Sequence, residues 1–373
     1  MIARLLRSRW SIPVAFVLLA LAYWWLHPRP PKVIGIGYIN ERSAILYNTL
    51  AQVRQPVAML HYGDRVELLR VETAQTSVRT AAGVIGWMDS RQVMEGSLWQ
   101  KTSNLLQRTR SMPVQARGHT KTVSNIRIEP GRNGPRIYQF IRGTPVYVYA
   151  REVADAPSPS EDGGADSKAA PGEDQKPKQE DWLLVMRDVS AADASATAES
   201  AATSSLMPSS PVSGAPLSAP PAPALGSAPP IQVAGWVLAR FIDLDLPGPV
   251  RDYASSADLH PVAWFELNRV PDGSGGEAPQ FLVAGTHGGE GLPCDFTMIR
   301  VYTWSARRQH YETAYIDNNL CGTLPILVTK SAAGPEFRFA GAGEKNAEHM
   351  YIMRQTVVRR VKSAAQSPPA RRR

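Results

Sequence analysis

The chain lacks the motifs that many enzyme classes depend on. It contains no phosphate-binding loop and no Gly-x-Gly-x-x-Gly fingerprint. Its seven histidines show neither the His-x₃-His nor the His-Glu-x-x-His spacing of zinc sites. We therefore expect no metal and no nucleotide cofactor.

Acidic residues are missing from both ends of the chain. Residues 1–32 carry five Arg or Lys and residues 354–373 carry seven, without any Asp or Glu. The rest holds 29 basic and 33 acidic residues, so the formal net charge of +8 comes from the ends. This distribution argues against nucleic acid as a partner of the body. We expect residues 363–373 to form a disordered, solvated tail, with contact to an anionic envelope polymer as the alternative.

Charge is also absent from one long apolar run, Trp10–Leu26, which follows three arginines. Its 17 residues are near the lower limit for a spanning helix, and the basic flank favours a cytoplasmic N-terminus. We expect residues 1–32 to be a basic N-terminus and transmembrane anchor. The expected location is the inner membrane, with a single span and most of the chain in the periplasm or outside the cell. A signal peptide cleaved after Ala20-Leu21-Ala22 and a buried core helix are the alternatives.

Only two cysteines are present, Cys294 and Cys321, which are 27 residues apart. In an exported chain, an even number of cysteines confined to one region indicates a disulfide. Closing a loop of this size would contribute about 3 kcal/mol in the chain-entropy model. Two unrelated thiols are the alternative.

Hydrophobic periodicity disappears from residues 154–180 and 190–230, which are rich in Pro, Ser, Ala and charged residues. Such composition predicts disorder. Between the two tracts lies DWLLVMRDV, residues 181–189, with the composition of a strand. One strand cannot form a domain, so we expect it to pair with strands on either side of the tracts.

A phrase occurs twice, as VIGWMDSRQV at residues 84–93 and VAGWVLARFI at residues 233–242. A Gly-x-x-Val stretch precedes each phrase. Earlier still lies a Ser-x-Ile stretch, which is Ser43-Ala44-Ile45 before the first phrase and Ser124-Asn125-Ile126 before the second. We infer an internal repeat of about five short strands, with both disordered tracts inserted in the second copy. The Gly of Gly-Trp is expected to permit a tight turn.

The second copy resembles the bacterial SH3 (SH3b) family. It has Asn125-Ile126-Arg127, Gly143-x-x-Val146-x-Val148, Trp182-x-x-Val185 and Gly235-Trp236-Val237 in the family's order. The first copy is more degenerate, with Ser77 near the expected first Trp. The resemblance implies two small barrels of five to six strands, over residues 33–97 and 113–250. It also implies binding of cell-wall peptides or other extended ligands, hence peptidoglycan or an envelope protein as partner.

The remaining segments complete a mainly β fold class: an N-terminal transmembrane helix, two small SH3-like barrels and a C-terminal antiparallel domain. Residues 98–112 predict a connecting helix, with Leu98, Leu105 and Leu106 on one face. Residues 258–362 contain seven candidate strands separated by turns, which indicates an antiparallel sandwich or barrel-like sheet.

Aromatic residues of the repeats are the candidate ligand-binding residues, because their faces suit extended ligands. They are Tyr62, Trp87, Tyr138, Tyr147, Trp182 and Trp236. For Trp87 and Trp236 of the two Gly-Trp pairs, a place in the core is the favoured alternative. Tyr62 and Tyr138 have polar neighbours, so we expect them to be exposed.

Catalytic chemistry has weak support. His287 and Cys294 bring to mind the L,D-transpeptidases, but Cys294 lacks the preceding Gly and following Arg of that family's motif. Asp272-Gly-Ser274-Gly-Gly-Glu277 predicts a turn rather than a calcium loop. We expect a non-enzymatic binding protein. The alternative is an envelope hydrolase or transpeptidase with its catalytic unit in the C-terminal β domain.

Overall fold

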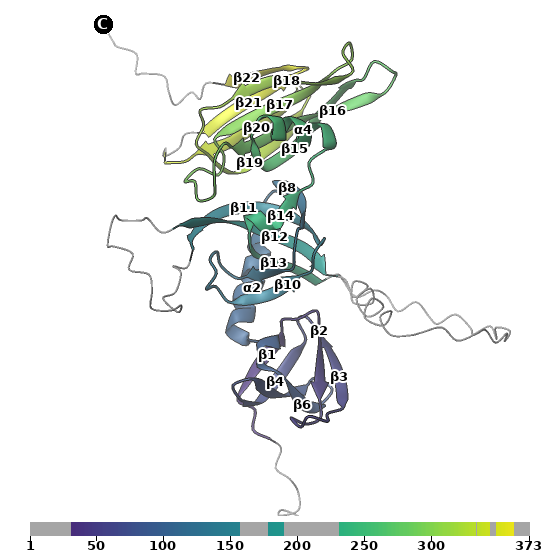
Figure 1. Cartoon of the computed structure of the whole chain (residues 1–373), viewed down its shortest axis with the longest axis vertical. Coiled ribbons are helices and arrows are strands. Elements are labelled where there is room, and N and C mark those ends of the chain that lie inside the picture. The colour runs from purple at the N-terminus through teal and green to yellow at the C-terminus, as the bar shows by residue number, and fades with distance from the viewer. Residues whose placement is uncertain (1–30, 157–177, 190–230, 333, 344–347, 362–373) are drawn as a thin grey trace, which may run out of the picture. The chain divides into compact units, whose positions relative to one another are not determined.

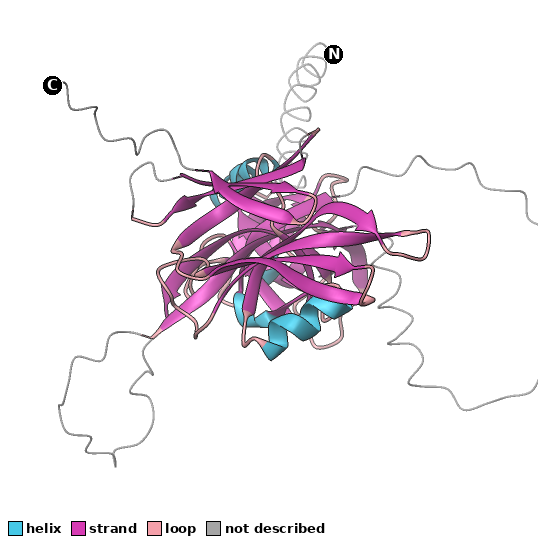
Figure 2. Ribbon diagram, turned by 90° about the horizontal axis from the view of Figure 1, so that it is seen from above, coloured by secondary structure: helices cyan, strands magenta, loops and turns pink. Residues whose placement is uncertain are grey.

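The computed structural model describes residues 31–156, 178–189, 231–332, 334–343 and 348–361. These residues form a mainly β protein with four antiparallel sheets and two α-helices (Figures 1 and 2), as the composition predicts. They divide into two compact units, which meet in sequence near Gly96. The expected anchor, Trp10–Leu26, lies outside the described residues. Among those that are described, none belongs to a helix long and apolar enough to cross a membrane.

The first unit contains a seven-stranded sheet with the order β3-β2-β6-β5-β4-β1-β7. Its strands are β1 (Gly35–Ile39), β2 (Ser43–Tyr47), β3 (Pro56–His61), β4 (Arg65–Val71), β5 (Gln75–Thr80), β6 (Ile85–Asp89) and β7 (Val93–Glu95). A 3₁₀ turn, Ser90–Gln92, joins the last two strands. The sheet encloses an apolar cluster that includes Ile39, Leu46, Val66, Val78 and Met88. We call this sheet the first repeat.

The second unit begins with a sheet of the same design, ordered β10-β9-β13-β12-β11-β8-β14. Its strands are β8 (Ala116–Thr120), β9 (Ser124–Arg127), β10 (Arg136–Phe140), β11 (Pro145–Asp155), β12 (Gln179–Val189), β13 (Ile231–Leu238) and β14 (Ile242–Leu244). A 3₁₀ turn again joins the last two strands, here over Ala239–Phe241. Each strand of this sheet occupies the position that the strand numbered seven lower occupies in the first repeat. The inferred internal repeat is therefore confirmed. We call this sheet the second repeat. Each repeat has seven strands rather than five or six.

The isolated segment around Trp182 pairs as expected. It forms β12, in which Trp182 lies opposite Glu152 of β11 on one side and Leu238 of β13 on the other. The hairpin of β11 and β12 is longer than expected, because pairing continues to Asp155 and Gln179. Residues 154–156 and 178–180, expected to be disordered, therefore belong to or adjoin these strands. The rest of both expected disordered tracts lies outside the described residues.

The repeated Gly-Trp pair has a different cause from the turn expected at the sequence level. Gly86 lies within strand β6, where an added Cβ would come 2.6 Å from Leu46 Cγ and from the Tyr47 carbonyl oxygen. Gly235 of β13 stands in the same relation to Ile126 and Arg127. A neighbouring strand passes too close for any side chain at these two positions. The phrase therefore recurs because both sheets need the same close approach.

The register of the two sheets corrects the sequence alignment by one residue. Trp87 pairs with Tyr47, and Trp236 pairs with Arg127. Tyr47 therefore corresponds to Arg127, and Ser124 corresponds to Ala44 rather than Ser43. The same register places Gln75, and not Ser77, at the position of Trp182. The shared serine misled the alignment, whereas the alternation of buried and exposed residues fixes it.

Helix α2 (Gly96–Arg110) is the connecting helix expected at residues 98–112. Its buried residues are Thr102, Leu105 and Thr109, whereas Leu98 and Leu106 are only half-buried. The two threonine hydroxyls donate to the carbonyls four residues earlier, which lets them be buried. Leu105 packs in a cluster with Trp182 and Trp236, so this helix covers one face of the second repeat.

The C-terminal part of the second unit is a sandwich of two four-stranded antiparallel sheets. The first holds β15 (His260–Pro271), β16 (Glu277–Thr286), β17 (Met298–Ser305) and β18 (His310–Asp317), and the second holds β19 (Gly322–Ser331), β20 (Gly334–Gly341), β21 (Glu348–Arg354) and β22 (Val357–Val361). Residues 349–361, expected as one strand, form a hairpin that turns at Gln355, whose φ is 54°. One apolar cluster fills the space between the sheets.

Helix α4 (Gly248–Ser256), which was not expected from the sequence, packs on the other face of the first of these sheets. Val250 and Ala254 of the helix join a cluster with Phe281 and Tyr302. The helix begins with Gly248-Pro249, and proline suits the first turn because its missing N–H costs no helical bond there.

Candidate functional site

Four of the six aromatic residues expected to bind a ligand are buried, which corrects that expectation for Tyr62, Tyr138, Trp182 and Trp236. Trp182 and Trp236 belong to the cluster beneath α2. Tyr62 and Tyr138 were expected to be exposed, but only 3% and 4% of their surface is accessible. Polar residues beside a tyrosine in the sequence reflect a local turn or strand edge. They do not show which residues cover the tyrosine ring in the fold. Tyr138, for example, packs edge to face against Phe140 with 5.5 Å between ring centroids.

The other two candidates, Tyr147 and Trp87, belong to different repeats. Tyr147 of β11 is 44% exposed, and the guanidinium of Arg117 lies 6.0 Å from the centre of its ring. Trp87 of β6 is half-buried and lies opposite Tyr47 of β2. The Arg54 guanidinium lies over the Tyr47 ring, 4.0 Å from its centre. Aromatic surface is thus partly accessible around Trp87, whose register partner on the adjacent strand is a second aromatic residue.

Aliphatic side chains extend this aromatic surface across strands β2 and β3. Leu46 and Leu60 of these strands point into the core. Because side chains alternate along a strand, their neighbours point outward. The exposed fractions are 39% for Ile45, 41% for Val57 and 60% for Met59. We define the outer face of the first repeat by five residues, Ile45, Tyr47, Val57, Met59 and Trp87.

The second repeat carries polar residues on the corresponding strands. On the outward side of β9 and β10, Gln139 donates a hydrogen bond of 2.9 Å to Asn125. The next outward pair is Arg127 and Arg136, which lie opposite each other. Arg127 also donates to the carbonyl of Gly134. One strand arrangement therefore carries an apolar face in the first repeat and a polar, charged face in the second.

Strand β3 also forms an edge of its sheet, because among the described residues only β2 pairs with it. Its sequence, PVAMLH, has no Lys, Arg, Asp or Glu. The corresponding edge strand of the second repeat, β10, has the sequence RIYQF and begins with an arginine. Charged residues at edges hinder pairing with other chains. Strand β3 lacks that protection.

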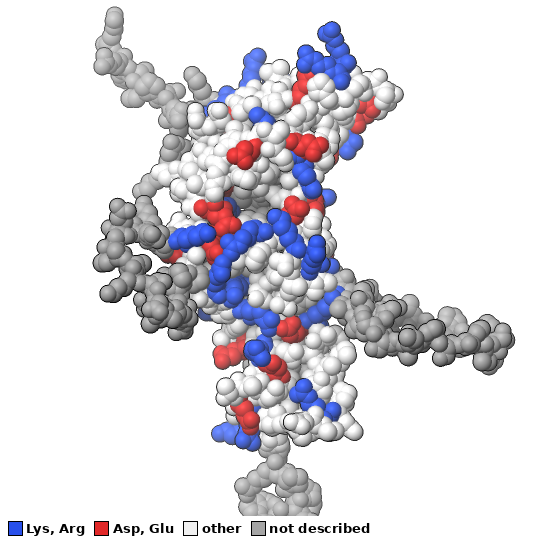
Figure 3. Space-filling model, in the orientation of Figure 1, with Lys and Arg blue, Asp and Glu red and all other residues white. Residues whose placement is uncertain are grey.

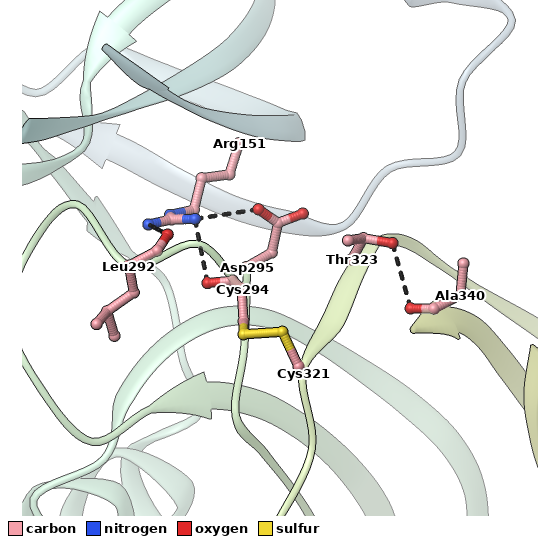
Figure 4. Close-up of a disulfide and its surroundings, with 7 residues drawn as sticks. All are labelled: Arg151, Leu292, Cys294, Asp295, Cys321, Thr323 and Ala340. Carbon is pink, nitrogen blue, oxygen red and sulfur yellow. Dashed lines mark hydrogen bonds and ion pairs between the residues drawn. A yellow bond between two sulfur atoms is a disulfide. The ribbon is translucent and has the colours of Figure 1, made fainter. Parts of the chain in front are cut away.

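A second feature of the molecule joins the second repeat to the C-terminal sandwich. Arg151 of β11 has 3% of its side chain exposed and forms ion pairs with Asp181 at 2.6 Å and Asp295 at 3.1 Å. It also donates to the carbonyls of Leu292 and Cys294 (Figure 4). Burial raises the pKa of Asp295, although Arg151 and the Leu324 N–H act in the opposite direction. These contacts fix the loop that carries Cys294 against the long hairpin.

Close to this junction, Glu180 of β12 forms ion pairs with two arginines. Its carboxylate lies 2.6 Å from Arg132 and 2.9 Å from Arg240, and only 3% of its side chain is exposed. The hydrogen bond from Arg132 is the main reason why the pKa of Glu180 is lowered. Basic and acidic side chains lie side by side over the second repeat in Figure 3. Every charge in this cluster is paired, so we interpret the cluster as structural.

The sites considered for catalysis and metal binding take structural roles. Cys294 and Cys321 form the expected disulfide, so Cys294 has no thiol to act as a nucleophile (Figure 4). Asp272 accepts hydrogen bonds from the N–H groups of Ser274 and Gly276, as a turn requires. Within the part of the chain that the structure describes, no three His, Cys, Asp or Glu side chains gather to hold a metal ion.

Most of the outer face is not evident from the sequence, because aliphatic residues on a strand are ordinarily assigned to the core. The signal was present in the difference between the copies. PVAMLH and RIYQF occupy equivalent edge strands, and only one of them carries a charge. Correct alignment of the strands is needed before this difference can be seen.

Comparison with known proteins adds no relative to this description. No family model, no curated protein and no solved structure matches this chain.

Proposed function

We propose that this chain is a non-enzymatic, membrane-anchored protein of a bacterial envelope that binds a protein partner through the outer face of its first repeat. One observation carries the proposal: Ile45, Val57 and Met59 are exposed beside Tyr47 and Trp87, whereas the second repeat has polar residues on the same strands. Contiguous exposed apolar side chains mark interaction surfaces. The polar counterpart argues that the apolar character is not a requirement of the fold.

The sequence supports the finer parts of the proposal. The order of the Asn-Ile-Arg, Gly-x-x-Val and Gly-Trp stretches is that of SH3b domains, which are small binding modules. Trp10–Leu26 has the length and flanking charge of an anchor that leaves the repeats outside the cytoplasm. The disulfide suits an oxidising compartment. The second repeat, whose outer face is polar and whose other face is covered by α2, serves as a spacer that carries the C-terminal sandwich.

A protein partner fits the outer face better than peptidoglycan does. Recognition of a glycan or of its charged peptide needs donors and acceptors directed at the ligand. The outer face offers chiefly methyl, thioether and ring groups, with a single cation, Arg54, already placed over Tyr47. The enzyme alternative has lost its clearest nucleophile, because Cys294 is bonded to Cys321.

The test is site-specific photocrosslinking of the full chain in membranes. A photoreactive amino acid replaces Met59 in one variant and Gln139, on the matched strand of the second repeat, in the other. An adduct is expected from position 59 and not from position 139, and Met59→Asp is expected to weaken binding of the purified partner at least tenfold. Equal adducts from both positions, or none from either, would contradict the proposal.

A sedimentation assay with purified sacculi distinguishes peptidoglycan from a protein partner as the ligand of the outer face. The full chain in detergent is compared with its Met59→Asp variant and with a Gln139→Asp control. Retention of wild type and control, but not of Met59→Asp, would replace the protein partner with peptidoglycan at this same face.

A further inference from the structure

We infer that the β3 edge of the outer face pairs with the β3 edge of a second copy of this chain, so that the two copies join edge to edge through antiparallel pairing of these strands. The inference rests on the proposed function, because it needs the outer face to be a binding surface. It adds the identity of the partner and the mode of contact. Two sheets of seven strands would become one continuous sheet across the pair.

The first argument is the state of the β3 edge. A sheet edge presents unpaired backbone N–H and C=O groups, and an uncharged apolar edge is an open template for another strand. Strand β3 is such an edge over Pro56–Leu60, whereas the N–H and C=O of His61 are bonded to Asp64 in the turn that follows. Proline occurs only at its first position, where it leaves the following N–H groups free to pair.

The second argument is self-complementarity. A symmetric dimer uses the same patch on both copies, so the patch must match itself. With the two-fold axis at Ala58, Val57 of one copy lies opposite Met59 of the second copy, on the outer face. Cross-strand neighbours of this kind are about 4.5–5.5 Å apart at Cβ and contribute through apolar contact. Because β3 carries no Lys, Arg, Asp or Glu, no like charges are brought together.

The third argument is the contrast between the repeats. A second copy of strand β10 placed against β10 would bring two arginines, one Arg136 from each copy, to the same edge. The β10 edge is therefore less suited to self-pairing than the β3 edge.

Cysteine crosslinking of the full chain tests the inference. The two native cysteines are bonded to each other, so an engineered thiol reacts alone. In the proposed register, the two copies of Met59→Cys lie diagonally, roughly 7–8 Å apart at Cβ. A short bismaleimide spans that distance. Gln139→Cys is the matched control on the second repeat.

The expected result is a covalent dimer of Met59→Cys in membranes and in detergent, with at least a tenfold lower yield for Gln139→Cys. Equal yields from the two variants would show random collision and would overturn the inference, as would no dimer from either. Light scattering of the detergent-solubilised chain gives a second measurement. Wild type and Gln139→Lys are expected to be dimers, and Met59→Lys a monomer.

The two proposals fail in different ways. Photocrosslinking from position 59 to a different protein, with monomeric wild type in light scattering, would overturn the dimer and leave the binding function standing. Absence of any adduct from position 59 would remove both. A circular dichroism spectrum unchanged by Met59→Lys excludes misfolding as the cause of a monomer, and a changed spectrum would assign Met59 to the fold and overturn both proposals.

Discussion

The side-chain amide of Gln115 pairs with the backbone of Ile326 as if it were a short piece of strand. The Ile326 N–H donates to Gln115 Oε1 at 2.8 Å, and Gln115 Nε2 donates to the Ile326 carbonyl at 3.3 Å. The backbone of Gln115 also bonds with Val148 and Trp264. One residue with 1% of its surface exposed thereby links the second repeat to both sheets of the sandwich.

Replacing this amide should destabilise the second unit. Gln115→Ala leaves the buried N–H and C=O of Ile326 without partners, which costs about 1–3 kcal/mol. The measurement is the free energy of unfolding from urea titration. Gln139→Ala, at a half-buried position on the outward side of β10, is the control and should change it by less than about 0.5 kcal/mol. Equal effects of the two substitutions would mean that the buried hydrogen bonds between Gln115 and Ile326 contribute nothing to the free energy of unfolding.

Adding a methyl group to either Gly-Trp glycine should also destabilise. Gly86→Ala and Gly235→Ala place a Cβ 2.6 Å and 2.8 Å, respectively, from a backbone carbonyl oxygen of the adjacent strand. Overpacking of this kind costs roughly 1–3 kcal/mol. Gly248→Ala, in α4, has nothing within 4 Å of its Cβ and should be neutral or slightly stabilising. Melting temperatures of the three variants provide the comparison.

Removing the buried Arg151 should be more harmful than removing a surface charge. Arg151→Met leaves Asp181 and Asp295 without their cation, and breaking a buried pair in this way costs about 3–5 kcal/mol. Arg151→Lys should recover only part of the loss, because one ammonium cannot reproduce the fork of guanidinium donors. Chemical unfolding of both variants measures the difference. Full recovery of stability by Arg151→Lys would show that the positive charge alone is sufficient and that the fork of guanidinium donors is not needed.

Glu180 should make stability depend on acid. Its pKa is lowered in the folded protein, chiefly by Arg132, so its stabilising contribution is present above the ordinary glutamate pKa. That contribution is lost as pH falls through the lowered value. Glu180→Gln should be less stable than wild type at neutral pH, and the gap should narrow on acidification. Unfolding measured from neutral pH into the acid range tests this, with the exposed Glu266→Gln as control.

Much of the fold could be predicted from the sequence because it depends on local patterns. Alternating apolar residues and turn glycines locate most strands of the sandwich, and the positive φ of Gly63 and Gly143 agrees with their place after the edge strands. The pairing of β12 followed from a negative argument: a lone strand must find partners. The disulfide followed from cysteine number and compartment.

What could not be predicted depends on contacts distant in sequence. Nothing in the residues around Tyr62 or Tyr138 indicates what covers their rings. The close approach at Gly86 depends on Leu46 and Tyr47, which lie about 40 residues earlier. The outer face required the register of two sheets before its apolar character stood out against Asn125 and Gln139.

The positions of β12 and β13 in the sheet order determine when the second repeat can be completed during synthesis of the chain. Strands β9 and β10 join the rest of that sheet only through β13, which ends at Leu238. A polypeptide that emerges N-terminus first can finish the first repeat once Glu95 is free, whereas β9 and β10, which end at Phe140, must wait for the 98 residues up to Leu238. The second sheet is therefore completed late, together with the start of the sandwich that it supports.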